Sequence, residues 1–515
     1  MNKIFDTGRR TALWVLVCVL STTFILSSCD AGGGATAATV DADNVLRQYR
    51  DILFFPRSGE GYPEKINAYI SERVTTMGYT AETDASGNVI VDVPASAGAE
   101  EQPLTILQCH TGDEIAVSKS RLFDAANDGV LIDAYREDGI IQGDDTSMGA
   151  SGAVGVATIL TVLQTSLRHG PIRAIFTCGQ DGDMSGARNL APEYPEGHCL
   201  ISLDGNRLGT VGIGAAYALT LRGDLNFTGA ATQGRHAYVL AASGFAGGRM
   251  TTNAGESRIN PVTLITEALT KAKSQGIFYE LCNFSAGSNA LRMPEEATAV
   301  VVLNDYEEKK FIRTFDEGAR EYRDRAGKDA EIAMIETAVP DEVMSNDESA
   351  NALTFLFGLL SSDFSADQAI SATLGIDRLD LSPHRFTCDI SVLGADEEAV
   401  GKINDEKANI EKLSSIPLVE TGRIPGFSTP EDSEAVRLLC KAYGHALGED
   451  CKTGAEASVG ELGYLKEKNP DLDIMSIGVT IDGRDTVNES FERNTLAIPA
   501  NAILEYLTSE SQKTR

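Results

Sequence analysis

Positively charged residues are scarce in this sequence of 515 residues. Lys and Arg number 44 against 75 Asp and Glu, which gives a net charge of −31 at pH 7. A protein that binds nucleic acid needs a basic patch to neutralise phosphates, and none stands out here. The composition therefore excludes nucleic acid as a partner, and the excess of acid predicts a soluble, self-repelling surface.

Paired cysteines and long apolar runs are also missing. No two cysteines have C-x-x-C spacing, and the seven that follow Cys29 are dispersed and odd in number, so we expect no disulfide framework. Cys109, Cys178 and Cys199 lie in apolar strand-like runs, which predicts buried thiols. The apolar run Leu13–Leu26 is too short for a comfortable membrane span.

The N-terminus nevertheless has the parts of an export signal. Three basic residues precede the apolar run, which ends in Leu26-Ser27-Ser28-Cys29. This ending resembles the bacterial lipobox, in which the cysteine becomes the lipidated first residue of the mature protein. We therefore expect residues 1–29 to be a lipoprotein signal peptide and Cys29 to anchor the exported protein to a membrane of the bacterial cell envelope. An ordinary signal peptide or an uncleaved anchor is the alternative. Residues 30–42 are expected to form a flexible tether.

The rest of the chain is too long for one ordinary core and suits two or three domains. Apolar runs at Leu104–Leu107, Ile172–Thr177 and Cys199–Leu203 alternate with helical patterns such as Gly152–Leu167. This alternation predicts an α/β layer with a mostly parallel sheet. From about residue 214 to about residue 424 the stretches become longer and more polar, which predicts a large insert in that layer.

Three polar side chains follow the predicted strands at the points where the strands end. His110, Asp181 and Asp204 each fall at or just past such a point. Ligands of parallel sheets bind beyond the carboxyl ends of the strands. We therefore expect these three residues to converge on one site.

Short motifs occur in a fixed order from about Asp43 to the C-terminus. They are Asp84-Ala-Ser-Gly-Asn-Val-Ile90, Leu107-Gln-Cys-His110, Met148-Gly-Ala-Ser-Gly-Ala-Val-Gly155, His169-Gly-Pro171, Met184-Ser-Gly-Ala187, Gly244-Phe-Ala-Gly-Gly248, Pro425-Gly-Phe427 and Met475-Ser-Ile-Gly478. In this order and spacing they resemble the co-catalytic zinc metallopeptidases, most closely the aminoacyl-histidine dipeptidases. The resemblance implies a catalytic α/β domain over residues 43–213 and 425–515, interrupted by an inserted α+β lid domain over 214–424 that is often used for dimerisation.

The resemblance also assigns roles to single positions. The general base falls on Gln180, and the metal ligands fall on His110, Ser151, Asp181, Asp204 and Asp485. The first ligand motif, His-x-Asp, is His110-Thr111-Gly112 in this chain, so its Asp is replaced by Gly112. In the lid, the His that reaches a neighbouring active site falls on Arg249, and the substrate-binding Arg-Asn pair falls on Ala290 and Leu291.

These replacements argue against ordinary peptide hydrolysis. Two Zn²⁺ ions ~3.5–4 Å apart need an anion between them, and the neutral hydroxyl of Ser151 does not supply one. The amide of Gln180 can position a water without deprotonating it, and loss of a general base costs ~10²–10⁴ in rate. We therefore expect the zinc implied by the resemblance to be weakly bound or absent.

The leading hypothesis is a pseudopeptidase that binds peptides, dipeptides or an envelope partner. One alternative is an active metal-dependent dipeptidase or amidohydrolase with a remodelled one-metal site, in which spare acids such as Asp113, Asp144 and Asp145, together with Glu114 and Asp183, hold a single divalent cation. Another is a scaffold protein that assembles, as a homodimer for example, through the lid.

Overall fold

The computed structural model describes residues 39–512, apart from residues 60, 114, 119–120, 125–126, 134–136, 180–183, 206, 246, 251–258, 289, 327–329 and 362–371. The expected signal peptide and Cys29 lie outside the described residues, as do Gln180 and Asp181. Residues 38–515 make up one compact unit. Within the described part of that unit, none of the helices combines the length and the apolar composition needed to cross a membrane.

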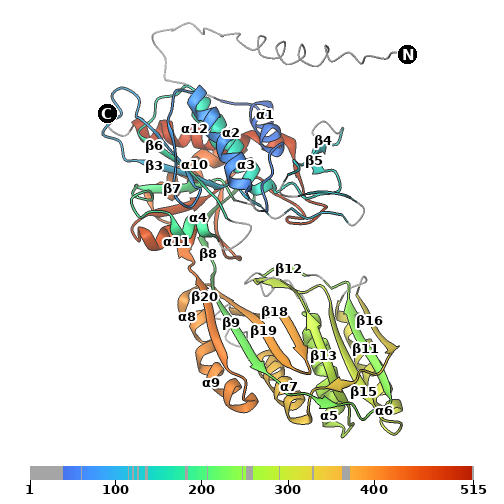
Figure 1. Cartoon of the computed structure of the whole chain (residues 1–515). Helices are drawn as coiled ribbons and strands as arrows, with labels where there is room; N and C mark the ends of the chain where they lie inside the picture. Colours follow the sequence, from blue (N-terminus) through green and yellow to red (C-terminus); the bar gives the residue numbers. More distant parts are fainter. Residues whose placement is uncertain are drawn as a thin grey trace, which may run out of the picture. The chain divides into compact units, whose positions relative to one another are not determined.

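A mixed sheet of nine described strands forms the centre of one part of the fold, to which both the N-terminal and the C-terminal segments of the described chain contribute (Figure 1). Its strands, in order across the sheet, are β1 (Ala81–Thr83), β2 (Val89–Val93), β6 (Ile172–Thr177), β3 (Thr105–His110), β7 (Cys199–Ser202), β23 (Asp473–Ser476), β8 (Thr210–Ala215) and β21 (Phe427–Ser428), and β22 (Lys452–Glu456) also pairs with β8. The central strands β6, β3, β7 and β23 are parallel. The flanking strands β1, β2, β8 and β21 join by antiparallel pairs.

The expected mostly parallel sheet is therefore correct for the centre and wrong for the flanks. An apolar run such as Ile172–Thr177 indicates that a strand is buried, and its bounds are those of β6. The run does not indicate whether the neighbouring strand is parallel or antiparallel, because the connection between the strands sets their relative direction and hydropathy does not.

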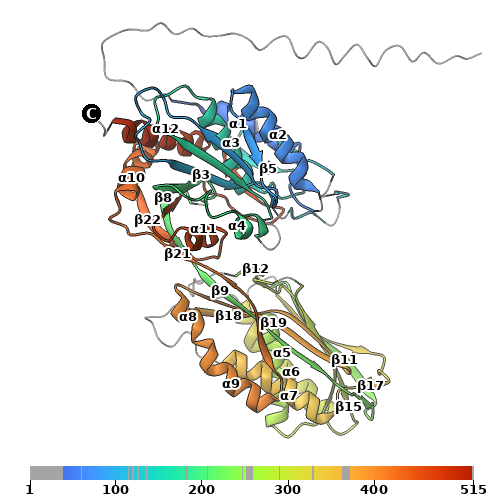
Figure 2. The same cartoon turned by 60° about the vertical axis from the view of Figure 1, so that its left-hand side comes forward.

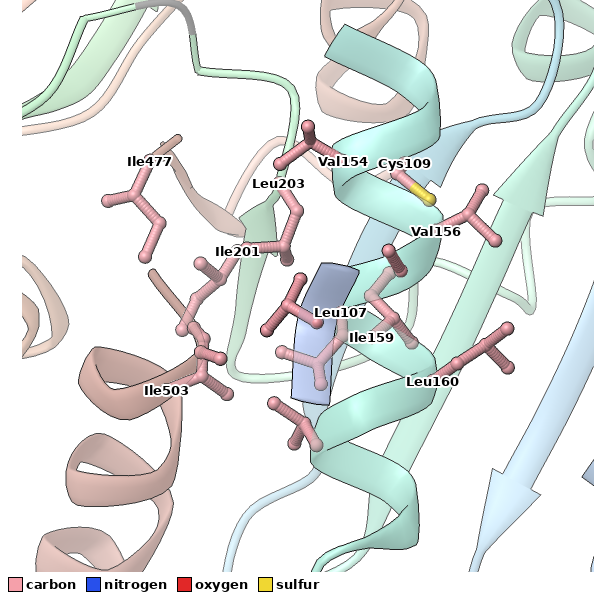
Figure 3. Packing of buried hydrophobic residues seen from close by; sticks show 14 of the residues in the cluster. Leu107, Cys109, Val154, Val156, Ile159, Leu160, Ile201, Leu203, Ile477 and Ile503 are labelled. Carbon is pink, nitrogen blue, oxygen red and sulfur yellow. The ribbon is translucent and has the colours of Figure 1, made fainter. Parts of the chain in front are cut away.

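Helices cover both faces of this sheet. On one side lie α1 (Ala42–Leu53), α2 (Tyr62–Thr76), α3 (Ala150–Gln164), α10 (Glu434–Leu447) and α12 (Ala497–Gln512), and on the other lie α4 (Ser185–Asn189) and α11 (Leu462–Lys468). Leu107 and Ile201 pack with Ile159 of α3 and Ile503 of α12 in the first cluster (Figure 3). The preceding residues on the strands, Ile106 and Leu200, belong to a separate apolar cluster on the opposite face, which includes residues of α4 and α11. Successive side chains of a strand point to opposite faces of the sheet, so this alternation is expected.

A second sheet, antiparallel throughout, is formed by eight described strands (Figure 2). In order these are β16 (Glu331–Thr337), β11 (His236–Ser243), β15 (Ala297–Leu303), β13 (Glu280–Ala286), β18 (Ala372–Ser382), β19 (Arg385–Gly394), β9 (Tyr217–Asn226) and β20 (Leu418–Ile424). Its helices are α5 (Pro261–Ser274), α6 (Glu308–Ala326), α7 (Asn346–Ser361), α8 (Glu397–Gly401) and α9 (Ile403–Ser414). Residues from α5, α6, α7 and α9 form one buried apolar cluster with the strands.

The chain passes between the two sheets at two points. Gly214 and Ala215 still pair with β21 in the first sheet, and β9 begins at Tyr217, so the second sheet begins a few residues after the expected boundary at 214.

At the N-terminal end, Val40 exchanges two hydrogen bonds with Asn501 of α12, at 2.9 and 3.0 Å. The end of the expected tether is therefore part of the folded unit.

Beside the first sheet, β24 (Ser490–Glu492) pairs with β5 (Ile140–Gly143) and β4 (Ile132–Asp133). Two further small sheets belong to the chain segment of the second sheet: β10 (Ala230–Ala231) with β17 (Glu342–Val343), and β12 (Gly248–Arg249) with β14 (Arg292–Met293). Just before β24 the chain makes a tight loop, in which Asp482 and Ser490 bridge each other through two backbone hydrogen bonds of 2.9 Å. The 3₁₀ turn Arg493–Thr495 follows. This loop carries residues 484, 485 and 489 of the site described next.

Candidate functional site

The site begins at the ends of two parallel strands. His110 is the last residue of β3, and Asp204 follows β7, which pairs with β3. The Nε2 atom of His110 lies 3.0 Å from the Asp204 carboxylate, so the structure brings these two predicted residues together. Asp181, the third residue expected here, lies outside the described part.

Both ring nitrogens of His110 face hydrogen-bond acceptors. Nδ1 lies 2.7 Å from the carbonyl oxygen of Gly112, and Nε2 faces the Asp204 carboxylate. A carbonyl and a carboxylate can only accept, so this geometry suits a ring that carries a proton on each nitrogen. Burial alone would lower the pKa of His110, but the charges of Asp204 and Asp113 outweigh it and raise the pKa to about 10.

Ser151 lies in the first turn of α3 and is buried. Its Oγ atom lies 3.4 Å from Nε2 of His110 and 3.5 Å from the Asp113 carboxylate. The helix begins after Gly149, which has a positive φ of 56°. The hydroxyl of Ser151 is thus at the centre of the cluster, as expected for the position to which the resemblance assigns the bridging ligand.

An arginine that the sequence reasoning did not single out reaches the same hydroxyl. Nη2 of Arg484 donates a hydrogen bond to Ser151 Oγ at 3.1 Å, and it lies 3.6 Å from the Asp204 carboxylate. Nε of Arg484 is 4.0 Å from the carboxylate of Asp485. Burial alone would lower the pKa of Arg484, but the charges of Asp204 and Asp485 outweigh burial and raise the pKa above its usual value. The guanidinium is therefore a permanent cation.

The loop that carries Arg484 is fastened to the start of α3. One carboxylate oxygen of Glu489 accepts hydrogen bonds from the backbone amides of Met148 at 2.6 Å and Ala150 at 3.2 Å. The other oxygen faces the amide of Asp485 at 3.5 Å. Asp485 itself has a φ of 62°, the left-handed region that a side chain seldom adopts. The loop geometry is therefore set by Glu489, which burial and Asp113 hold at a raised pKa of about 7.

A second buried arginine, Arg57, neutralises the opposite side of the cluster. Its Nη2 atom lies 3.1 Å from the Asp113 carboxylate and donates to the carbonyl oxygens of Met148, at 2.9 Å, and Gly149. Only 2% of the side chain is exposed. Asp113 is therefore committed to Arg57 and does not stand ready as a spare acid.

A tyrosine fills the space beside Gly112, the position that replaces the Asp of the first ligand motif. A Cβ atom at Gly112 would overlap the hydroxyl and ring carbons of Tyr62. The Tyr62 hydroxyl accepts a hydrogen bond from the amide of Gly179 at 2.7 Å, which holds the ring in place. Gly112 is therefore required by packing, and no larger residue fits unless Tyr62 moves.

A pocket opens next to the cluster, with a cavity volume of about 50 Å³. Its charged lining is Asp204, Glu456, Glu461 and Arg484, and hydroxyl groups and apolar side chains complete it. Glu461 is 2% exposed. One of its oxygens accepts from Gln108 at 2.5 Å and from Thr177 at 2.6 Å, whereas the other has no hydrogen-bond partner in the described chain. Burial raises the pKa of Glu461 to about 7.

The residues of the cluster do not fit a two-zinc centre. Among the described residues no three His, Cys, Asp or Glu side chains are grouped so as to hold a metal ion. The position to which the resemblance assigns the bridging ligand is a hydroxyl, and a guanidinium lies against both Ser151 and Asp204. Those acids proposed for a one-metal site that the structure describes do not gather either. Asp144 pairs with Arg121 at 2.8 Å and is 69% exposed, and Asp113 pairs with Arg57. Glu114 and Asp183 lie outside the described residues.

The three lid positions lie in or beside the second sheet. Arg249 is in β12, paired through the backbone with Arg292 of β14. Ala290 is exposed, and Leu291 has a φ of 60° and donates its amide to Asp377 at 2.8 Å. Leu291 packs against an apolar cluster, so a substrate-binding role for it has no polar group to act through.

The signal that could have revealed Arg484 was present in the sequence. It directly precedes Asp485, so an arginine stands next to a position that should hold a metal ligand. A fixed positive charge that faces the site would repel a neighbouring metal ion. Tyr62, by contrast, is distant in sequence from Gly112 and gave no such sign.

The two sheets with their helices have the same fold as solved peptidase structures. The aminoacylhistidine dipeptidase of Vibrio alginolyticus matches with a TM-score of 0.69 and 21% identity, over 92% of this chain and 98% of that chain. An M20 family metallo-carboxypeptidase from Sulfolobus solfataricus matches with a TM-score of 0.52 and 11% identity, over 91% of this chain and 99% of that chain.

The sequence itself is homologous to a dipeptidase. The cytosol non-specific dipeptidase of Escherichia coli is 22% identical over 442 residues, which cover 83% of this chain and 90% of that protein. No protein-family model matches the sequence. The resemblance stated from the motifs is therefore confirmed at the level of fold and homology to dipeptidases.

Proposed function

We propose that this protein is an exported, lipid-anchored relative of the aminoacyl-histidine dipeptidases that binds peptides and has lost two-zinc hydrolysis. One observation carries the loss of hydrolysis: the guanidinium of Arg484 donates to Ser151 and lies beside Asp204. Those two residues occupy positions that the resemblance assigns to metal ligands. A protein cation thus takes the place of a metal cation.

The charges give the size of the conflict. Two unit charges ~4 Å apart at an effective dielectric constant of ~20 interact by about 4 kcal/mol, and a divalent ion doubles this to about 8 kcal/mol. A Zn²⁺ ion beside Asp204 would have to overcome that repulsion from Arg484, with His110 Nε2 already 3.0 Å from the same carboxylate. Ser151 offers no negative charge in return. Metal binding is therefore strongly disfavoured as long as Arg484 keeps this position.

The pocket beside the cluster supports binding of the amino group of a peptide. Its cavity volume of about 50 Å³ has room for a small polar group of that kind. Its lining carries the carboxylates of Asp204, Glu456 and Glu461 against the single guanidinium of Arg484, so the pocket attracts a positive group. The free oxygen of Glu461 is a buried acceptor that needs a donor. The ammonium group of a peptide N-terminus would supply that donor.

Export and anchoring follow from the N-terminal sequence. A basic segment, an apolar run and the Leu26-Ser27-Ser28-Cys29 ending support a lipoprotein signal peptide, with Cys29 as the lipidated residue in the cell envelope. The related dipeptidase of Escherichia coli is described as cytosolic, so this chain would differ from that relative in compartment as well as in the site.

The decisive experiment uses the chain from residue 30 onward, with Arg484→Met as a matched variant. Bound metal is measured by elemental analysis, Xaa-His and other dipeptides are assayed with added Zn²⁺, Mn²⁺ or Co²⁺, and dipeptide binding is measured by calorimetry. We expect substoichiometric metal, no turnover and saturable binding. About two metals per chain with robust turnover would overturn the proposal in favour of an active hydrolase. Stable self-association without peptide binding would overturn it in favour of a scaffold.

A further inference from the structure

Cys440 and Cys451 are brought together by the turn that follows α10. The helix ends at Leu447. Gly448 follows with a φ of 83°, and its backbone N–H donates a hydrogen bond to the Gly444 carbonyl oxygen at 2.8 Å. The chain then folds back over the helix. A Cβ atom at Gly444 would lie 3.8 Å from Cβ of Cys451. Cys440 is one helical turn before Gly444, on the same face of α10.

The side chains of Cys440 and Cys451 interact with each other, and each thiol shifts the pKa of the other. Both side chains are partly exposed, whereas the other five described cysteines are buried: Cys109, Cys178, Cys199, Cys282 and Cys388. The interaction with Cys440 lowers the pKa of the Cys451 thiol, and the backbone amide of Val211 adds to this effect. The same interaction raises the pKa of Cys440. Cys451 is therefore the better nucleophile of the pair.

The backbone around the pair is fixed on both sides. Cys440 lies within α10. Cys451 directly precedes β22, which begins at Lys452, and the backbone N–H of Lys452 donates a hydrogen bond to the Gly209 carbonyl oxygen at 2.9 Å. β22 runs parallel to β8 in the first sheet. A helix and a sheet thus fix the backbone on both sides of these neighbouring side chains.

We propose that Cys440 and Cys451 form a disulfide bond in the exported protein. The oxidant is a disulfide, either a small molecule such as glutathione disulfide or a protein thiol–disulfide oxidoreductase. The Cys451 thiolate attacks one sulfur of that disulfide and releases a thiolate. Cys440 then loses its proton and attacks the Cys451 sulfur of the mixed disulfide, releasing the second thiolate. Two protein thiols become one S–S bond, and the oxidant is reduced to two thiols.

The proposed export would bring the chain to a compartment that holds such oxidants. The chemistry itself depends only on the geometry of the turn. It is therefore tested in vitro, where a failure of the export proposal has no bearing on the result.

The test incubates the chain from residue 30 onward with glutathione disulfide, denatures it in the presence of an alkylating agent, and maps the digest by mass spectrometry without reduction. We expect one linked peptide pair joining Cys440 to Cys451, lighter by two hydrogen atoms, with the five buried cysteines alkylated. In Cys440→Ser, Cys451 should remain as a mixed disulfide with glutathione. In Cys451→Ser, Cys440 should react with glutathione disulfide at least about tenfold more slowly than Cys451 does in Cys440→Ser.

Either of two results would overturn the proposal. The first is recovery of both cysteines in alkylated form from folded, oxidant-treated protein. The second is a glutathione adduct on Cys451 that persists in the wild-type chain. Cys282→Ser serves as the control, because it removes a buried thiol and should leave the linked pair unchanged.

Discussion

The guanidinium of Arg484 donates a hydrogen bond to the hydroxyl of Ser151 at 3.1 Å, so a fixed positive charge lies beside a side chain at a metal-ligand position. The same guanidinium faces Asp204 and Asp485. Three carboxylates, those of Asp113, Asp204 and Asp485, thus face three positive groups of the chain, the guanidinium groups of Arg57 and Arg484 and the protonated ring of His110. These three carboxylates are balanced without an ion.

Removal of Arg484 should destabilise the fold. In Arg484→Met, Asp204 and Asp485 lose their nearest guanidinium while the length of the side chain is kept. We expect the free energy of unfolding in urea at pH 7 to fall by about 2 kcal/mol, because uncompensated partly buried charge is costly. Arg493→Met removes a surface pair with Asp43 and should cost at most ~1 kcal/mol. Equal effects of the two variants would contradict the assigned role.

The packing of Gly112 against Tyr62 predicts a strong coupling between them. Gly112→Ala should cost about 1–3 kcal/mol because the new methyl group overlaps the Tyr62 ring. In Tyr62→Ala the overlap is gone, so the double variant should be more stable than the sum of the two single effects by at least ~1 kcal/mol. A double-mutant cycle in urea measures this coupling, and additive effects would exclude it.

The same contact bears on any attempt to restore the metal centre. Gly112→Asp, Ser151→Asp, Gln180→Glu, Asp181→Glu and Asp485→His supply the family ligands but leave Tyr62 and Arg484 in place. The carboxylate at 112 would then overlap a ring, and the guanidinium would still repel the ion. We therefore expect no metal from these five changes alone, and recovery of bound zinc only when Tyr62→Ala and Arg484→Ala are added.

Much of the first sheet and part of the site follow from the sequence. The run Ile172–Thr177 gave the bounds of β6, and the meeting of His110 and Asp204 followed from the rule that parallel strands end at one edge. Arg484 and Tyr62 did not follow, because their effect depends on where a loop and a helix carry their side chains. Hydropathy records burial along one segment and does not record which distant side chain fills a given space.

Glu461 should contribute to binding of the amino group of a peptide. Glu461→Gln keeps the oxygen that accepts from Gln108 and Thr177 and removes the charge on the free oxygen. We expect the affinity for a dipeptide with a free N-terminus to fall about tenfold, near the value of one charge-assisted hydrogen bond. The affinity for the N-acetylated dipeptide should not change. Calorimetry with both peptides makes the comparison, and an equal loss for both would assign Glu461 a structural role.

Cys29 should decide where the protein is found. In Cys29→Ser the signal peptide loses its site of lipid attachment. We expect the wild-type chain to sediment with membranes and to take up labelled fatty acid, and the variant to do neither. Lipid labelling of the variant, or soluble wild-type protein, would contradict the assignment. Cys18→Ser lies within the apolar run and serves as the control, which should behave as the wild type does.

Asp377 should make stability depend on pH. It is buried at a bulge in β18, where one carboxylate oxygen accepts from Ser391 and from the Leu291 amide. Burial raises its pKa to about 7, and Asp389 adds to the effect. Between pH 4 and 7 the folded chain therefore holds a proton that the unfolded chain releases, so stability falls as the pH rises through this window. The loss attributable to Asp377 is at most about 4 kcal/mol, at 1.36 kcal/mol per pKa unit.

Asp377→Asn isolates this contribution, because the amide cannot ionise. Glu461 and Glu489, whose pKa values are also raised to about 7 by burial, act in the same direction in both proteins and cancel in the comparison. Urea unfolding at pH 5 and pH 8 should therefore give a smaller decline for Asp377→Asn than for the wild type. Asp380→Asn, on the same strand but 60% exposed, should decline as the wild type does. Identical declines in all three proteins would show that Asp377 is ionised in the fold already at pH 5.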